Sequence, residues 1–172
     1  MRLEDIDGKV FVDANIFLYP ALDDPRYRES VNRFLKRISN GDVIGFTSVL
    51  VLNEVLHKLM ISEVAKKCKI SPSESLRHMK SNPAIISQLE KCWDDIKWIK
   101  EIRNLTILDI TTEISALGLK YSKDFKLLSS DGVHVATMEM HGLTNLASND
   151  SDFERVDWIN LYKPSKILIE SK

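Results

Sequence analysis

Short apolar runs predict five buried strands along the chain. Runs of about four to eight apolar residues bounded by polar ones are typical of strands that are covered on both faces. The expected strands span residues 9–13, 42–46, 105–110, 143–147 and 158–162. Between them, apolar side chains recur every three or four residues, a spacing that predicts helices. These helices are expected over 25–40, after Ser48, over 111–122 and over 131–141.

The ends of these helices carry the expected signals. Asp23-Asp24-Pro25 opens the first helix, and Thr47 or Ser48 and Thr111 or Thr112 are good N-cap residues for two others. Gly142 stands where a helix commonly ends. The segment 63–104 is less regular, with Ser71-Pro72 and Asn82-Pro83 as breaks before a long helical pattern. We expect it to form a helix–turn–helix on one side of the domain.

Strands that alternate with helices predict a parallel sheet with helices on both faces. We therefore expect an α/β fold, a three-layer α/β/α domain with a central, mainly parallel five-stranded sheet. This domain spans residues 1–163 and includes the helical segment 63–104, and residues 164–172 form a C-terminal tail.

Composition narrows the class of protein. The 172 residues are 44% hydrophobic and 28% charged, which suits one globular domain. No apolar run approaches the roughly 20 residues of a membrane span, and acids occupy the N-terminus where a secretory signal would be apolar. Two cysteines, Cys68 and Cys92, are too few for a disulfide framework. A cytoplasmic protein is expected.

The net charge of −1 argues against a general, high-affinity nucleic-acid binder, because phosphate contacts need an excess of Lys and Arg. It does not argue against an enzyme, since a site with several carboxylates lowers the net charge while local cations still bind phosphate.

Four acids fall at related places in the predicted fold. Asp13 ends the first strand, Asp131 begins a helix and Asp150 follows the fourth strand, so all three lie where parallel strands end. Glu54 lies on the helix after strand two and shares a helix face with His57. Taken singly, each aspartate is more often a helix N-cap, and the ordinary alternative for Glu54 is a side chain that extends to solvent. Carboxylates gathered at one edge repel one another, and a divalent cation with oxygen ligands relieves that repulsion.

Four segments that contain these acids resemble the motifs of PIN domains. They are Val12-Asp13-Ala14-Asn15-Ile16-Phe17, the stretch Ser48 to Leu56, the stretch Ser130 to Thr137 and the stretch Ala147 to Phe153. The match runs in order over residues 9–162. Two departures are the length of segment 63–104 and Gly132, which replaces the more usual alanine and is expected to be harmless.

The resemblance implies a ribonuclease that uses Mg²⁺ or Mn²⁺. It places the catalytic, metal-binding acids at Asp13, Glu54, Asp131 and Asp150, with Asp152 as a fifth metal ligand. Asn15 and Ser148 match polar positions that orient the carboxylates. The closest subgroup is the VapC-like toxins, which implies an RNA substrate, an antitoxin partner and a homodimer.

As a mechanistic hypothesis, Asp13 and Asp150 hold the metal directly, and Asp131 or Glu54 orients the attacking water. Basic residues offered for RNA phosphates are Arg26, Arg28, Lys58 and Lys123, for which solvated surface charge is the ordinary interpretation. His57 and His134 either touch substrate or, more commonly for histidines with apolar neighbours, pack between helices.

Three other interpretations remain open from the sequence. A phosphatase of the haloacid-dehalogenase kind, or a receiver domain, also begins with an acid at the end of strand one, but Asn15 stands where the former needs a second aspartate. A PIN-like module without catalysis would be expected to lose acids that are costly to keep. A PIN nuclease that processes RNA outside toxin–antitoxin systems is the third.

Overall fold

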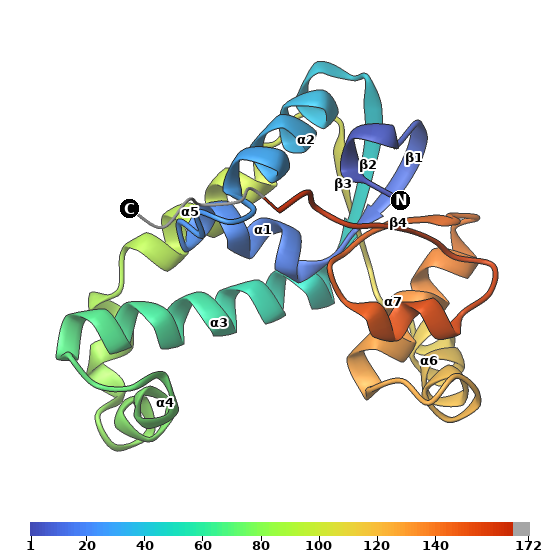
Figure 1. The fold of residues 1–172 in the computed structure, drawn as a ribbon. Coiled ribbons are helices and arrows are strands. Elements are labelled where there is room, and N and C mark those ends of the chain that lie inside the picture. The colour runs from blue at the N-terminus through green and yellow to red at the C-terminus, as the bar shows by residue number, and fades with distance from the viewer. Residues whose placement is uncertain (167–172) are drawn as a thin grey trace.

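The computed structural model describes residues 1–166, which fold around one parallel sheet of five strands (Figure 1). The strand order is β3-β2-β1-β4-β5. The strands are β1 Gly8–Val12, β2 Val43–Ser48, β3 Leu105–Leu108, β4 Asn145–Ala147 and β5 Asn160–Tyr162. The predicted central, parallel five-stranded sheet is confirmed, although strand two ends two residues later than expected.

Strand β1 lies at the centre of the sheet and positions the site. It pairs with β2 from Gly8 and Val43 onward, and its last residues pair with β4, with Val12 opposite Ala147. The chain first builds the sheet outward through β2 and β3, then returns to the other side of β1 to form β4 and β5. The direction of the crossovers therefore reverses between β1 and β4, and open parallel sheets bind ligands at this point.

Helices cover both faces of the sheet, which confirms the three-layer α/β/α architecture. Figure 1 shows α1, α2 and α5 on one side, and α6 and α7 on the other. Their bounds are α1 Ala14–Ala21, α2 Arg28–Asn40, α5 Lys91–Lys100, α6 Thr112–Asp124 and α7 Ser129–Met140. Thr111 caps α6 as predicted, and Gly142 follows α7 with a φ of 62°.

Helix α1 is not predicted from the sequence, because residues 14–21 show no clear helical pattern. Five of its eight residues are buried, so its apolar side chains form no stripe opposite a polar face. Pro20 lies inside it, and an internal proline normally argues against a helix. The tertiary contacts of this largely buried helix thus outweigh its weak sequence signal.

The segment after β2 forms a helical arm that leads away from the sheet (Figure 1). It comprises α3 Val49–Cys68, α4 Pro72–Ser81, the 3₁₀ helix η2 Pro83–Gln88, and α5. Ser48 caps α3 as predicted, and the two expected breaks become the starts of α4 and η2, each with its proline in the first turn.

Glu63 ties α5 to α3. Its carboxylate accepts hydrogen bonds from the backbone N–H groups of Glu90, Lys91 and Cys92 at 2.9, 3.3 and 2.9 Å. Burial alone would raise the pKa of Glu63, but these three N–H groups outweigh it and lower the pKa. Because α5 has no side-chain cap of its own, Glu63 supplies that cap from another helix.

The last described residues are held against the N-terminal part of the domain. Pro164 is buried, and the backbone N–H of Ser165 donates to Ser30 Oγ at 3.1 Å. The rest of the expected tail, residues 167–172, lies outside the described residues. Among residues 1–166, no helix is both long and apolar enough to cross a membrane.

Helices α6 and α7 approach each other closely at two glycines. A Cβ atom added to Gly132 would lie 2.5 Å from the Gly118 carbonyl oxygen and 2.3 Å from Ser122 Oγ. A Cβ atom added to Gly118 would lie 2.8 Å from Val133 Cα. The glycine that replaces the usual alanine at position 132 is therefore required by the spacing of this helix pair.

We predict that Gly132→Ala destabilises the protein by about 1–3 kcal/mol, the usual cost of forcing extra atoms into a packed site. Helix propensity alone would make this variant more stable, because alanine is favoured over glycine within a helix by about 1 kcal/mol. A loss of stability would therefore indicate a steric clash. Urea unfolding followed by circular dichroism measures the change. Lys120→Ala, on the exposed side of α6, is the control and should shift stability little. A Gly132→Ala variant as stable as wild type would contradict the close approach.

Candidate metal centre

Asp13 is the most firmly held acid of the site. It follows β1, caps α1 and is only 7% exposed. Its Oδ1 accepts from the Ala14 N–H at 2.6 Å, and its Oδ2 accepts from Ser148 Oγ at 2.7 Å and from the Asn15 side-chain amide. Asn15 also donates to Ser148 Oγ at 2.8 Å. Asp13 therefore keeps one orientation at the carboxyl end of the central strand.

Glu54 reaches the same place from the second turn of α3. Its Oε2 lies 3.3 Å from Nε2 of His134, a residue of α7 with 1% exposure. One ligand atom from each of Asp13, Glu54 and His134 fits within a 4.8 Å span. Three elements that are distant in sequence thus converge on one point.

Asp131 and Asp150 complete a cavity of about 290 Å³. Asp131 lies in the first turn of α7, which begins at Ser129, two residues earlier than predicted. Asp150 follows β4 and caps the 3₁₀ helix η3 (Ser151–Arg155) by accepting from the Asp152 N–H at 2.8 Å. The cavity is lined by Asp13, Ala14, Asn15, Glu54, His57, Lys58, Leu128, Ser130, Asp131 and Asp150.

The acids of this cavity differ in electrostatic setting. Burial raises the pKa of Asp13, against the lowering effects of His134 and of the bonds from Ser148 and Ala14. Burial also raises the pKa of Asp131 to about 6, with repulsion from Asp13, Asp150 and Glu54 adding to the effect. For Glu54, burial is outweighed by His134 and by further contacts, so its pKa is lowered. The cluster therefore holds negative charge at an energetic cost.

This donor set fits a hard divalent cation. Mg²⁺ and Mn²⁺ prefer oxygen ligands, and carboxylates from Asp13, Glu54, Asp131 and Asp150 surround one cavity. A cation there would replace repulsion between carboxylates with attraction. Each of the three aspartates lies at an end of a strand or a helix, as the sequence predicted, and the N-cap interpretation is also met for Asp13 and Asp150.

Comparison with known proteins identifies the family, since the family model of the PIN domain matches residues 10–159. This chain belongs to the PIN-domain family. It is similar to Ribonuclease VapC2 of Methanocaldococcus jannaschii, with 25% identity over 163 residues that cover 93% of this chain and 97% of the relative.

Two solved structures show the same fold as this PIN domain. VapBC2 from Rickettsia felis, bound to a DNA fragment from its promoter, superposes with a TM-score of 0.61 and 14% identity, covering 91% of this chain and 99% of that chain. Mycobacterium tuberculosis VapC20, described as a sarcin–ricin loop cleaving toxin, superposes with a TM-score of 0.57 and 14% identity. The match covers 84% of this chain and 92% of that chain.

Of the remaining residues predicted for the site, some contact its acids and one lies outside the cavity. Asn15 and Ser148 contact the Asp13 carboxylate, in keeping with an orienting role. Asp152 does not line the cavity, and its Oδ1 accepts from Arg155 at 2.8 Å, so its role as a fifth metal ligand stays a prediction.

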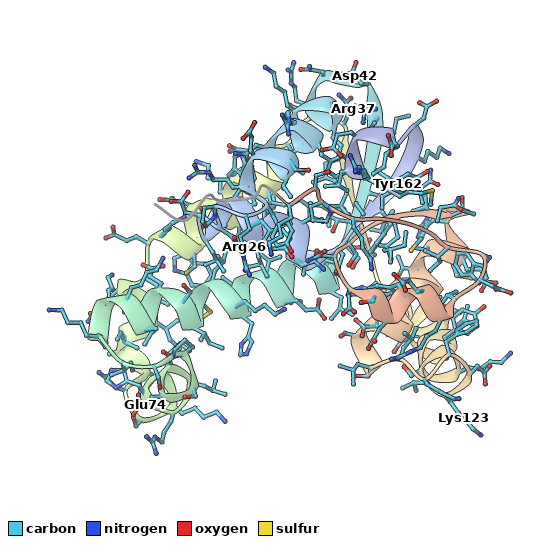
Figure 2. The ribbon with its side chains drawn as sticks, viewed as in Figure 1. Arg26, Arg37, Asp42, Glu74, Lys123 and Tyr162 are labelled. Atoms are coloured by element: carbon cyan, nitrogen blue, oxygen red, sulfur yellow. The ribbon has the colours of Figure 1, made fainter. Side chains whose placement is uncertain are left out.

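Of the four basic residues offered for RNA contacts, Lys58 alone lines the acid cavity. Arg26 pairs with Asp24 at 2.6 Å, and Arg28 pairs with Asp23. Figure 2 shows Lys123 at the outer end of α6, pointing away from the rest of the molecule.

His134 is a residue of the site that the sequence does not predict. Its apolar sequence neighbours favour helix packing as its commoner role, and the PIN motifs do not place it among the site residues. It is buried, yet it contacts Glu54 of the site. Its position three residues after Asp131, on the same helix face, was the available signal.

We predict that metal-free Asp131→Asn is more stable than metal-free wild type at about pH 7.5, by about 1–2 kcal/mol. Because folding raises the pKa of Asp131 to about 6, the protonated form favours folding and wild type loses stability as pH rises through that value. The advantage of the variant should shrink toward about pH 4.5, where Asp131 is protonated in the folded protein.

Urea unfolding in the presence of a chelator, at several pH values, measures this difference. Asp157→Asn is the matched control, because Asp157 is an exposed aspartate outside the cavity, and it should change stability little at any pH. Equal stability of Asp131→Asn and wild type across the pH range would contradict charge repulsion within the cluster.

Proposed function

We propose that this PIN domain is a metal-dependent endoribonuclease that hydrolyses RNA phosphodiester bonds. The observation that carries the proposal is the cavity shared by Asp13, Glu54, Asp131 and Asp150, the four acids of the PIN motifs. We assign these four residues as catalytic and metal-binding, with Mg²⁺ or Mn²⁺ as the cofactor. The similarity to Ribonuclease VapC2 over 93% of the chain supports the same reaction.

When bound, such a cation lowers the pKa of a coordinated water and neutralises charge on the scissile phosphate. The protein residues have separate tasks. Ser148 and Asn15 hold Asp13 in one orientation through its Oδ2. Asp131 lines the same cavity from the first turn of α7, and we assign to its carboxylate the acceptance of a proton from the attacking water.

RNA as the substrate fits the rim of the cavity. Lys58 and His57 line it beside the acids, and a lysine at this rim offers a cation for the phosphate next to the cut. A net charge of −1 favours recognition of a particular RNA over general attachment to nucleic-acid backbones. An RNA substrate also fits the cytoplasmic location expected from the sequence.

We expect the wild-type protein to cut a mixed RNA pool with Mg²⁺ or Mn²⁺ and to stop when a chelator is added. Asp13→Asn and Glu54→Gln should lower the cleavage rate at least about 100-fold, because each removes a charged metal ligand. Lys58→Gln should weaken cleavage by about 10-fold through loss of one phosphate contact, with a smaller dependence on salt. Gel electrophoresis with sequencing of fragment ends measures both the rate and the site of cutting.

Arg26→Gln is the control for Lys58→Gln, because Arg26 is a surface cation already paired with Asp24 outside the cavity, and it should cleave like wild type. Cutting that survives in both Asp13→Asn and Glu54→Gln would refute the assigned site. A folded protein that binds metal and RNA without cutting would favour a PIN-like binding module instead.

We also propose that the protein is the toxin of a toxin–antitoxin pair. The similarity to Ribonuclease VapC2 and the fold shared with VapC20, which is described as a toxin, support this role, with an antitoxin protein as partner. In cells, wild type expressed alone should then arrest growth and Asp13→Asn should not. Normal growth with active wild type would favour an RNA-processing nuclease outside such pairs.

We further propose a homodimer, supported by apolar side chains exposed on neighbouring elements. Val49 of α3 and Leu119 of α6 border a groove of about 450 Å³, and Leu119 is 67% exposed. Large exposed apolar patches commonly mark protein interfaces.

Light scattering coupled to gel filtration should report twice the chain mass for wild type, and the chain mass for Leu119→Lys. Lys120→Ala, the neighbouring exposed position, is the control and should remain dimeric. A wild type that is monomeric at every concentration would rule out the homodimer, and a dimeric Leu119→Lys would rule out this face.

A further inference from the structure

His134 is a polar residue sealed beneath the acid cavity. Its side chain is 1% exposed, and its ring centroid lies 5.8 Å from that of Phe11 in the central strand. Among residues 1–166, its Nδ1 is the buried side-chain nitrogen or oxygen that has no hydrogen-bond partner. Burying an imidazole with one nitrogen unpaired is costly, so the other nitrogen is expected to make a hydrogen bond that offsets part of this cost.

That other nitrogen, Nε2, contacts Glu54. The Nε2 atom lies 3.3 Å from Glu54 Oε2 and joins α7 to α3 across the cavity. The side chain of Glu54 is long and 26% exposed. Its backbone lies one helix turn from His57 and Lys58, which also line the cavity. A buried donor on α7 therefore holds the carboxylate of Glu54 near the other acids of the cavity.

The same contact argues that His134 does not bind a metal through Nε2. An ionised carboxylate can only accept, so Nε2 must carry the hydrogen of this bond and has no free lone pair. The remaining nitrogen, Nδ1, has no hydrogen-bond partner among residues 1–166, so the contact with Glu54 is the one hydrogen bond of this imidazole in that part of the chain. This arrangement matches residues that orient metal ligands from behind.

We propose that His134 is a positioning residue of the metal centre, which holds Glu54 toward Asp13 and Asp131 through its Nε2 hydrogen bond. The inference rests on the proposed metal-dependent function. It predicts that His134 acts on metal affinity through Glu54, because Glu54 is the hydrogen-bond partner of the His134 side chain among residues 1–166.

Titration with Mn²⁺, followed by the electron paramagnetic resonance of the free ion, tests this role without any activity assay. His134→Leu should weaken Mn²⁺ binding by about 10–100-fold, the usual effect of losing a group that orients a ligand. His134→Gln, whose amide can still donate, should stay within about three-fold of wild type. His141→Gln, at the exposed end of the same helix, is the control and should bind like wild type.

A double-mutant cycle separates positioning from packing. If His134 acts through Glu54, adding His134→Leu to Glu54→Gln should weaken binding no further. Additive losses, or a His134→Leu variant that binds as wild type does, would overturn the role. Thermal unfolding of each metal-free variant shows whether a loss of binding reflects a loss of fold.

Pulsed measurements on the bound Mn²⁺ supply the last distinction. Nitrogen coupling from a coordinated imidazole in wild type would make His134 a ligand and overturn the positioning role, whereas its absence supports that role. A folded wild type that binds no Mn²⁺ would refute the metal centre itself. Binding by wild type with no effect of His134→Leu would refute this inference alone.

Discussion

Repulsion between carboxylates gathered at the carboxyl edge of the sheet is the constraint around which this structure is organised. Parallel strands deliver Asp13 and Asp150 to neighbouring loops, and α3 and α7 add Glu54 and Asp131. The surrounding contacts oppose the repulsion in different ways. Ser148, Asn15 and a backbone N–H fix Asp13, whereas His134 reaches Glu54 from beneath. A bound cation would offset the repulsion between these carboxylates.

The two helices that carry Asp131 and Glu54 are positioned by specific contacts with neighbouring helices. Helix α7 carries both Asp131 and His134, and its distance from α6 is set by the contact of Gly132 with Gly118. Helix α3 carries Glu54 near one end, and near the other end its Glu63 caps α5. Helix packing beside the cavity at Gly132, and farther along α3 at Glu63, therefore helps to determine where two of the acids lie.

The sequence was sufficient for much of the fold and for the acids. Alternating strands and helices predict the parallel sheet, and aspartates at strand and helix ends converge by topology alone. What escaped depends on tertiary contacts. Helix α1 lacks a polar face and contains Pro20, so no local pattern distinguishes it. His134 has apolar neighbours in sequence, and only the approach of α3 shows its polar contact. The need for Gly132 likewise arises from Ser122 and Gly118 on a different helix.

The central place of β1 in the sheet has a consequence for folding of the chain during its synthesis. The hydrogen bond between Asp13 and Ser148 joins residues 135 positions apart. Strand β4 is synthesised long after β2, the other neighbour of β1 in the sheet. A ribosome delivers the N-terminal portion first, at about 5–20 residues per second. A chain still under synthesis lacks Ser148 and Asp150, and with them a complete set of acids. The centre can therefore form only once nearly the whole domain has emerged, so the growing polypeptide spends its time beside ribosomal RNA without a finished site.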